Sequence, residues 1–287
     1  MSEIVKYHNY MNSLIFNGFT VTDFNFLLSL CSRMKDKDLN RVTFTFTELR
    51  ILTNYKKSNS IKQFVKDLKE MNEKLMKITC SLKTETEIIM FVLFPTFAIN
   101  LDEQTLTVSV NERFRFILNE LIKNFTRFDL QEFVSLESKY SKSLYRLLKQ
   151  YRTTGKYEVS VDDFRAKMDC PESYNNKQFM QNIINPALKS LQNYFQNLQC
   201  EPKYARKRGM PVIGYIFTFM PENVKSQTDH AQAHRGNEIS NKKDSDGYAA
   251  FPQRRYDFEK LEGNLLKRDD NECGQEDIEK LLEEFRK

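Results

Sequence analysis

An α+β fold with two tandem winged-helix domains and a flexible C-terminal tail is predicted by a repeated order of elements. Residues 44–64 and 159–179 align at a constant offset of 115, which pairs Arg50 with Arg165. In each copy a short strand is followed by a short helix, a turn, a longer helix with a polar face and a β-hairpin. That order is typical of the winged helix-turn-helix, and two such modules can lie on successive stretches of one DNA duplex.

The composition predicts a globular protein that binds no membrane. The chain of 287 residues is 40% hydrophobic and 29% charged, so most of it can bury a core. It contains no run of about 18 apolar residues, and its first residues lack the apolar centre of a signal peptide. Five cysteines without a CxxC pair indicate free thiols. We therefore expect a cytoplasmic protein, and a formal net charge of +5 is compatible with DNA binding.

The first predicted domain spans residues 1–125. Its longer helix carries an apolar stripe and, on another face, several lysines. The periodicity predicts helices at 20–34, 47–55, 59–77 and 111–123, and strands at 41–46, 78–84, 88–99 and 105–110. The candidate DNA contacts of this domain are Lys56, Lys57, Lys62 and Lys66.

The second predicted domain spans residues 126–222 and follows a short connector at 124–130. Helices are predicted at 131–151, 161–168 and 176–195, a strand at 158–161, and a hairpin from 196–205 and 211–220. Ser160 or Asp162 is the expected cap of the short helix. Pro186 lies inside the long helix, where it should bend the helix or mark its restart.

A basic stripe follows the first helix of this domain. It comprises Lys139, Lys142, Arg146 and Lys149 and contains no acidic residue. A solvated basic face is one interpretation. A stripe without internal ion pairing is better suited to following DNA phosphates, so we include these residues among the candidate contacts.

The helix at 176–195 has an apolar half and an opposite face rich in amides. Asn and Gln can each form two hydrogen bonds with an adenine edge in the major groove, and Asn is a weaker helix former than Glu or Lys. An Asn-biased composition is the alternative explanation. We favour base readout, with Lys177, Gln178, Gln181, Asn182, Asn185 and Lys189 as the candidate contacts.

The hairpin tip carries a dense basic cluster, formed by Lys203, Arg206, Lys207 and Arg208. A wing of this kind would lie against phosphates or enter a minor groove. An exposed charged loop is the alternative, but the neighbouring amide-rich helix favours DNA contact.

The sequence predicts no enzyme, no cofactor, no metal and no small-molecule ligand. No phosphate-binding loop is present, since the string from Gly209 to Gly214 lacks the lysine. His230 and His234 have the spacing of helical metal ligands but no accompanying carboxylate or cysteine. Asp162 and Asp163 lie at a helix start, where capping explains them.

Residues 223–287 are predicted to form a disordered linker and a short C-terminal docking motif. The stretch 223–247 is polar and lacks apolar periodicity, and an amphipathic island follows at 251–266. The candidate docking residues in this island are Phe251, Arg254, Tyr256, Phe258 and Leu261.

The run Ser138-Lys139-Tyr140-Ser141 followed by Leu144-Tyr145-Arg146-Leu147-Leu148 resembles plasmid replication initiators with two winged-helix domains, of the theta-type iteron class. Residues 184–191 (INPALKSL) and Lys6-Tyr7-His8-Asn9 resemble further parts of that family's pattern, and the resemblance extends over about residues 5–220.

The resemblance implies a DNA-binding protein that initiates plasmid replication at double-stranded origin iterons. It implies that the C-terminal winged helix makes the main contacts, and that the N-terminal one serves for dimerisation and secondary DNA contact. Monomers would initiate, and dimers would repress their own synthesis at an operator inverted repeat. The tail would recruit the host replicative helicase or another initiation factor. The alternatives are a phage or plasmid replisome organiser or helicase loader, and a plain repressor; the missing metal-site histidines disfavour a nicking enzyme.

Overall fold

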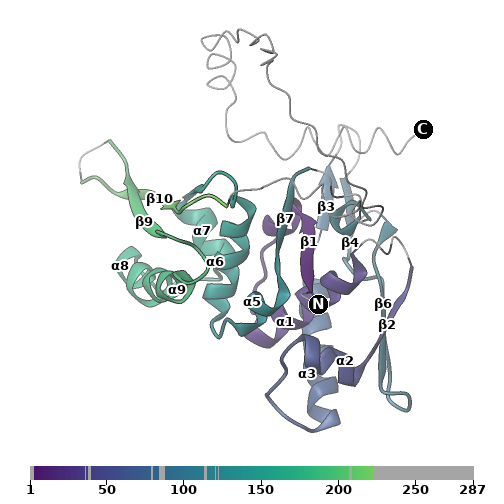
Figure 1. Cartoon of the computed structure of the whole chain (residues 1–287). Coiled ribbons are helices and arrows are strands. Elements are labelled where there is room, and N and C mark those ends of the chain that lie inside the picture. The colour runs from purple at the N-terminus through teal and green to yellow at the C-terminus, as the bar shows by residue number, and fades with distance from the viewer. Residues whose placement is uncertain are drawn as a thin grey trace, which may run out of the picture. The chain divides into compact units, whose positions relative to one another are not determined.

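The computed structural model describes residues 3–222, except residues 36, 38, 39, 79, 84–87, 113, 114, 120, 122, 207 and 208 (Figure 1). All described residues belong to one compact unit, Met1–Asn223, and a second unit is Val224–Lys287. The predicted linker and docking motif lie outside the described residues. No helix within the described residues is long and apolar enough to cross a bilayer.

The first winged helix is built from α1, β2, α2, α3, β5 and β6. Its three strands form an antiparallel sheet in the order β2-β6-β5, in which Phe44 lies opposite Leu106 (Figure 1). A separate hairpin, β3 with β4, is inserted between α3 and β5. The bounds are α1 Val21–Met34, β2 Val42–Thr45, α2 Phe46–Leu52, α3 Ile61–Lys77, β3 Cys80–Lys83, β4 Ile88–Phe91, β5 Thr96–Asn100 and β6 Thr105–Ser109.

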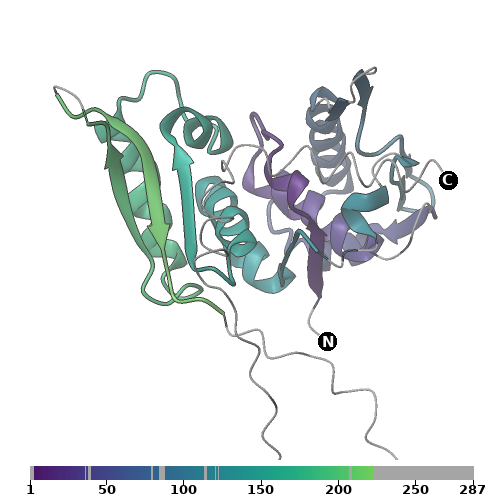
Figure 2. The same ribbon diagram turned by 90° about the horizontal axis from the view of Figure 1, so that it is seen from above.

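The second winged helix repeats this topology. Its sheet has the order β8-β10-β9, which matches β2-β6-β5 strand for strand, and Val159 lies opposite Tyr215. Figure 2 shows this sheet on one side of the unit, with the β9–β10 hairpin extending beyond the helices. The bounds are α6 Lys139–Gln150, β8 Lys156–Ser160, α7 Val161–Lys167, α8 Asn176–Phe179, π-helical η3 Met180–Ile184, α9 Asn185–Leu191, β9 Gln199–Tyr204 and β10 Val212–Thr218. The predicted tandem winged helices are therefore confirmed.

The predicted connector at 124–130 is wrong, because Phe125–Asp129 forms strand β7. This strand pairs antiparallel with β1, Ile4–His8, and the two strands form a sheet of their own. The 3-10 turn η1, Asn9–Asn12, continues from β1. The proposed domain boundary between residues 125 and 126 thus falls inside a strand whose partner is near the N-terminus.

Two predicted helices also differ from the structure. The helix expected at 131–151 is two helices, α5 Leu130–Ser135 and α6, because Ser138 caps α6 by accepting hydrogen bonds from the N–H groups of Tyr140 and Ser141. Of the helix expected at 111–123, the described residues contain only the single turn α4, Arg115–Leu118.

Helix α6 joins the two winged helices. It packs against α9 of the second one, against α1 of the first, and against β7 of the separate two-stranded sheet. Arg146 of α6 is 2% exposed, and its guanidinium donates to the carbonyl of Met11 at 3.1 Å and to Oδ1 of Asn12 at 3.2 Å. It also donates to the carbonyl of Leu14 at 3.5 Å. These bonds tie the N-terminal segment after β1 to the second half of the unit.

We expect Arg146→Met to lower the free energy of unfolding by on the order of 3 kcal/mol, because several buried oxygens lose their donor. Arg33→Met is the matched control. The Arg33 side chain is 40% exposed, and its guanidinium forms ion pairs with Glu3 and Glu48. Loss of these exposed ion pairs should lower the free energy of unfolding by less than about 1 kcal/mol. Urea denaturation of both variants measures the difference, and equal losses would contradict the role given to Arg146.

Candidate nucleic-acid interface

The repeated Arg50 and Arg165 perform the same structural task in the two helix-turn-helix units. Arg50 donates to the carbonyls of Ser58 and Ser60 at 2.9 and 3.1 Å, in the turn before α3. Arg165 donates to the carbonyls of Pro171 and Tyr174, in the turn before α8. Each arginine therefore fixes the turn that sets the direction of the following helix.

The helices on either side of these turns are held by matching contacts in the two copies. Each guanidinium lies over the phenylalanine at the buried side of the long helix, 4.6 Å from the ring of Phe64 and 5.2 Å from that of Phe179. Thr45 and Ser160 cap the short helices by accepting from backbone N–H groups at 3.1 and 3.2 Å. Of the two expected caps of the short helix α7, Ser160 is the one that the structure shows.

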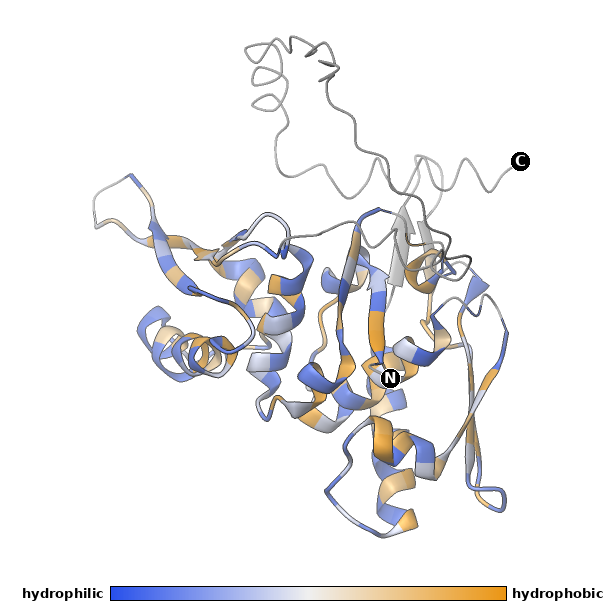
Figure 3. Cartoon of the chain, in the orientation of Figure 1, coloured by the Kyte–Doolittle hydropathy of each residue, from blue (hydrophilic) through white to orange (hydrophobic). Residues whose placement is uncertain are grey.

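The long helix of the second winged helix presents the amide face that the sequence predicts. Its apolar half is buried, packing against α6 and, through Phe179, against Tyr215 of β10. Figure 3 shows hydrophilic residues along its outer side. All six candidate residues are exposed, namely Lys177, Gln178, Gln181, Asn182, Asn185 and Lys189. We call this set the amide face.

Gln178 differs from the other members of the amide face because it is part of a capping box. Its Oε1 accepts from the backbone N–H of Asn175 at 2.9 Å, and its own N–H donates to the Asn175 side chain. The side chain therefore stabilises the helix start. This leaves Gln181, Asn182 and Asn185 as the amides of the face for which the structure gives no capping role.

The wing lies in the β9–β10 hairpin, next to the amide face. Arg206 is exposed. Lys203 forms an ion pair with Glu158 of β8, and its hydrogen bond is the main reason that the pKa of Glu158 lies below its ordinary value. Lys203 thus brings less net charge to the wing than the sequence suggests. Lys207 and Arg208 lie outside the described residues.

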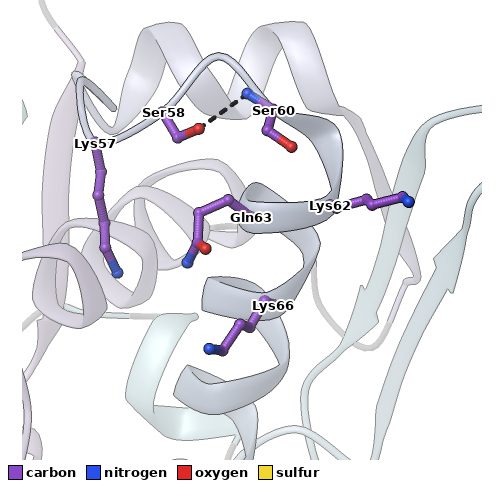
Figure 4. A pocket seen from close by; sticks show the side chains of 6 residues that line it. All are labelled: Lys57, Ser58, Ser60, Lys62, Gln63 and Lys66. Atoms are coloured by element: carbon purple, nitrogen blue, oxygen red, sulfur yellow. Dashed lines mark hydrogen bonds between the residues drawn. The ribbon is translucent and has the colours of Figure 1, made fainter.

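The first winged helix carries exposed lysines around a hollow of about 570 Å³ at the start of α3 (Figure 4). Lys57, Lys62 and Lys66 line this hollow together with Ser58, Ser60 and Gln63. Lys56 is also exposed. A hollow with three cationic side chains and two serines at its rim has the chemistry to receive a phosphate group.

A buried carboxylate positions two of the side chains in this hollow. Asp67 is 3% exposed and accepts from Lys57 at 2.7 Å, from Tyr55 at 2.7 Å and from Gln63 at 2.8 Å. Burial alone would raise the pKa of Asp67, but these hydrogen bonds lower it below its ordinary value. Lys57 is thus partly neutralised. Lys66 forms an exposed ion pair with Glu70 at 3.7 Å, and Lys62 projects from the helix.

The basic stripe of α6 is not a DNA-contacting face, and the prediction is wrong for three of its members. Lys142, Arg146 and Lys149 are 0%, 2% and 7% exposed. Lys142 donates to the carbonyl of Phe133, and Lys149 pairs with Glu222 at 2.7 Å. Lys139, at the start of the helix, is half-buried and pairs with Asp169 at 2.8 Å. Their partners come from other segments, which explains why the stripe needs no acidic residue of its own.

Sequence reasoning missed the structural role of the two arginines, although their identity within the repeat was a usable signal. It also missed the π-helical turn in the long helix, for which the internal Pro186 was the signal. Within the described part of the chain, no group of three His, Cys, Asp or Glu side chains could hold a metal ion.

Comparison with known proteins gives matches over nearly all the described residues. The family model described as initiator replication protein, WH1, matches residues 4–149, and the model described as initiator Rep protein, WH2, matches residues 160–219. A probable replication protein of Bifidobacterium longum (strain NCC 2705) is 35% identical over 224 residues, which are 77% of this chain and 74% of that protein.

A replication initiation protein of Escherichia coli is 24% identical over 231 residues, covering 76% of this chain and 70% of that protein. Among solved structures, the Pi initiator protein in complex with iteron DNA matches with a TM-score of 0.54 at 16% identity, over 77% of this chain and 98% of that chain. This likeness supports the tandem winged-helix fold.

The burial of Lys142 predicts a pH-dependent stability. Burial lowers the pKa of Lys142 to about 7, whereas a lysine in the unfolded chain titrates near 10.4. Between these values the unfolded chain binds a proton that the folded chain does not, so this contribution to stability rises with pH.

We expect the free energy of unfolding of the wild type to rise relative to Lys142→Met as the pH increases from about 7 to about 9. Chemical denaturation of both proteins across this range gives the difference. Lys189→Met, a change at an exposed lysine of α9, is the matched control. A difference between wild type and Lys142→Met that stays constant with pH would contradict the assignment.

Proposed function

The chain belongs to the initiator replication protein family, and from this premise we propose that it initiates plasmid replication by binding iteron repeats in double-stranded DNA at an origin. The second winged helix makes the main contacts through the amide face. The first makes secondary contacts through Lys56, Lys57, Lys62 and Lys66, whose side chains lie at or near the start of α3.

The amide face is the observation that carries this proposal. The helix buries its apolar side in the core. Apart from Gln178, which caps the helix start, the exposed amides and lysines opposite have no capping role and can contact DNA. Side-chain amides distinguish adenine from the other bases in the major groove. The adjoining wing supplies Arg206 and its basic neighbours for phosphate contact, which positions the helix but carries no sequence information.

Dimerisation, autoregulation and recruitment complete the proposal. The first winged helix forms a homodimer in equilibrium with the monomer, and the dimer represses synthesis of the protein at an inverted repeat. The tail island with Phe251, Arg254, Tyr256, Phe258 and Leu261 docks a host initiation factor such as the replicative helicase. The protein acts in the cytoplasm and without enzymatic activity. Support for these parts comes from the family resemblance and the apolar island in the sequence.

A mobility-shift assay on the DNA flanking this gene tests the proposal. At about 150 mM salt with excess competitor DNA, salt-sensitive nonspecific binding is suppressed. We expect a ladder of discrete complexes on short direct repeats. One shifted band on an inverted repeat alone would favour a repressor. No specific shift would overturn the proposal in favour of a helicase loader that acts through protein contacts.

Deletion of residues 249–287 tests the docking role of the tail. We expect the truncated protein to give the wild-type ladder on its repeats, because both winged helices are retained. Plasmid maintenance should fail, because the host factor loses its docking peptide. Replacing only Phe251 and Phe258 with alanine should give the same separation of binding from maintenance. Maintenance that survives the deletion would show that the tail is dispensable.

A further inference from the structure

The two long helices differ by one residue in the spacing of their buried positions. In α3 these positions are Phe64, Asp67, Leu68, Met71 and Leu75. In the long helix of the second winged helix they are Phe179, Ile183, Ile184, Ala187 and Leu191. After the phenylalanine the next buried position follows at three residues in the first helix and at four in the second. From there onward the two patterns coincide.

The π-helical turn η3 accommodates the additional residue. The backbone N–H of Asn185 bonds to the carbonyl of Met180, five residues earlier, instead of four as in an α-helix. Pro186 gives a physical cause. In a regular α-helix its ring would collide with the carbonyl of Asn182, four residues earlier, and a wider turn relieves that collision.

The inserted residue lies on the exposed side. Between the first two buried positions, α3 has the half-buried Val65 and the exposed Lys66. The second helix has the half-buried Met180 and then two exposed amides, Gln181 and Asn182. The register shift therefore adds a second hydrogen-bonding side chain next to Gln181 without displacing any core residue.

The first helix lacks this pair and is chemically different at its start. Its exposed side carries Lys62 and Lys66, the second in an exposed ion pair with Glu70 at 3.7 Å, and Ser60 at its N-cap makes no side-chain capping bond. The second helix has a capping box from Asn175 and Gln178. Free N–H groups and lysines at a helix start suit a phosphate, whereas paired amides suit a base edge.

Building on the proposed function, we propose that the one-residue π insertion makes the second helix the base-reading helix of the two, with Gln181 and Asn182 as the specificity-determining pair. The first helix, which lacks the insertion, binds backbone phosphates without distinguishing sequences. The preferred site of the pair contains adenine, whose N6 and N7 atoms match a side-chain amide.

Deletion of Asn182 combined with Pro186→Ala is the sharpest test, because it restores the spacing of α3 and removes the proline that opposes a regular helix. Pro186→Ala alone, which keeps both amides, is the matched control. The wild type first selects its sequence from a random duplex library. Affinities for the selected duplex and for random duplex are then measured for every variant, with circular dichroism as the folding check.

We expect the deletion variant to bind random duplex like the wild type and to lose roughly 5- to 150-fold of its preference for the selected duplex, the range given by one bidentate base contact. Asn182→Ala, which keeps the helix length, should also lose preference for the selected duplex. This variant serves as the test if the deletion variant does not fold. Lys66→Ala should weaken binding to both duplexes equally.

Wild-type preference in folded Asn182→Ala or in the folded deletion variant would overturn this inference while leaving the proposed function standing. A loss of preference in Lys66→Ala as large as that in Asn182→Ala would also overturn it, because both helices would then read sequence. A wild-type chain that selects no sequence from the library would overturn the proposed function, and this inference with it.

Discussion

Burial of a basic stripe on α6 is the constraint on which the arrangement of the two winged helices depends. Arg146, Lys142 and Lys149 lie inside the unit, where each charged group needs hydrogen-bonding partners to offset the loss of water. Main-chain carbonyls of the η1 segment and of α5, together with Glu222, supply them. Since these partners come from both ends of the described chain, the stripe holds the N-terminal segment and the end of the second winged helix against one helix.

Within that frame, each helix-turn-helix is a local structure and was accessible from the sequence. The repeated strand, short helix and long helix follow from residue periodicity and from caps such as Ser160, all within about twenty residues of sequence. The exposed amide face could be predicted for the same reason, because a helix of known phase has only one polar side. Arg50 and Arg165 lie in that local range too, and their repeated identity reflects one task, the bonding of turn carbonyls.

The features that residue periodicity did not predict depend on distant partners or on a local break of periodicity. Strand β7 forms because β1 lies beside it, more than one hundred residues away in the chain. The α6 stripe has the charge pattern of a phosphate-binding face, and only the positions of Met11, Leu14 and Phe133 show that it is interior. The π turn at Met180–Ile184 changes the helical phase by one residue, which a pattern with a single period does not include.

The pairing of β1 with β7 also has a consequence for synthesis on the ribosome. Val5 and Tyr7 of β1 are fully buried against elements that include β7 and α1. Their partner strand, β7, ends at Asp129. The turn η1 that follows β1 is bonded by Arg146, which lies still later in the chain. A nascent chain must therefore wait for well over one hundred further residues before this strand is covered, and such long-range closure slows folding. The elements of the first winged helix are synthesised first, but β1 is covered only after β7, and then α6 with Arg146, have emerged.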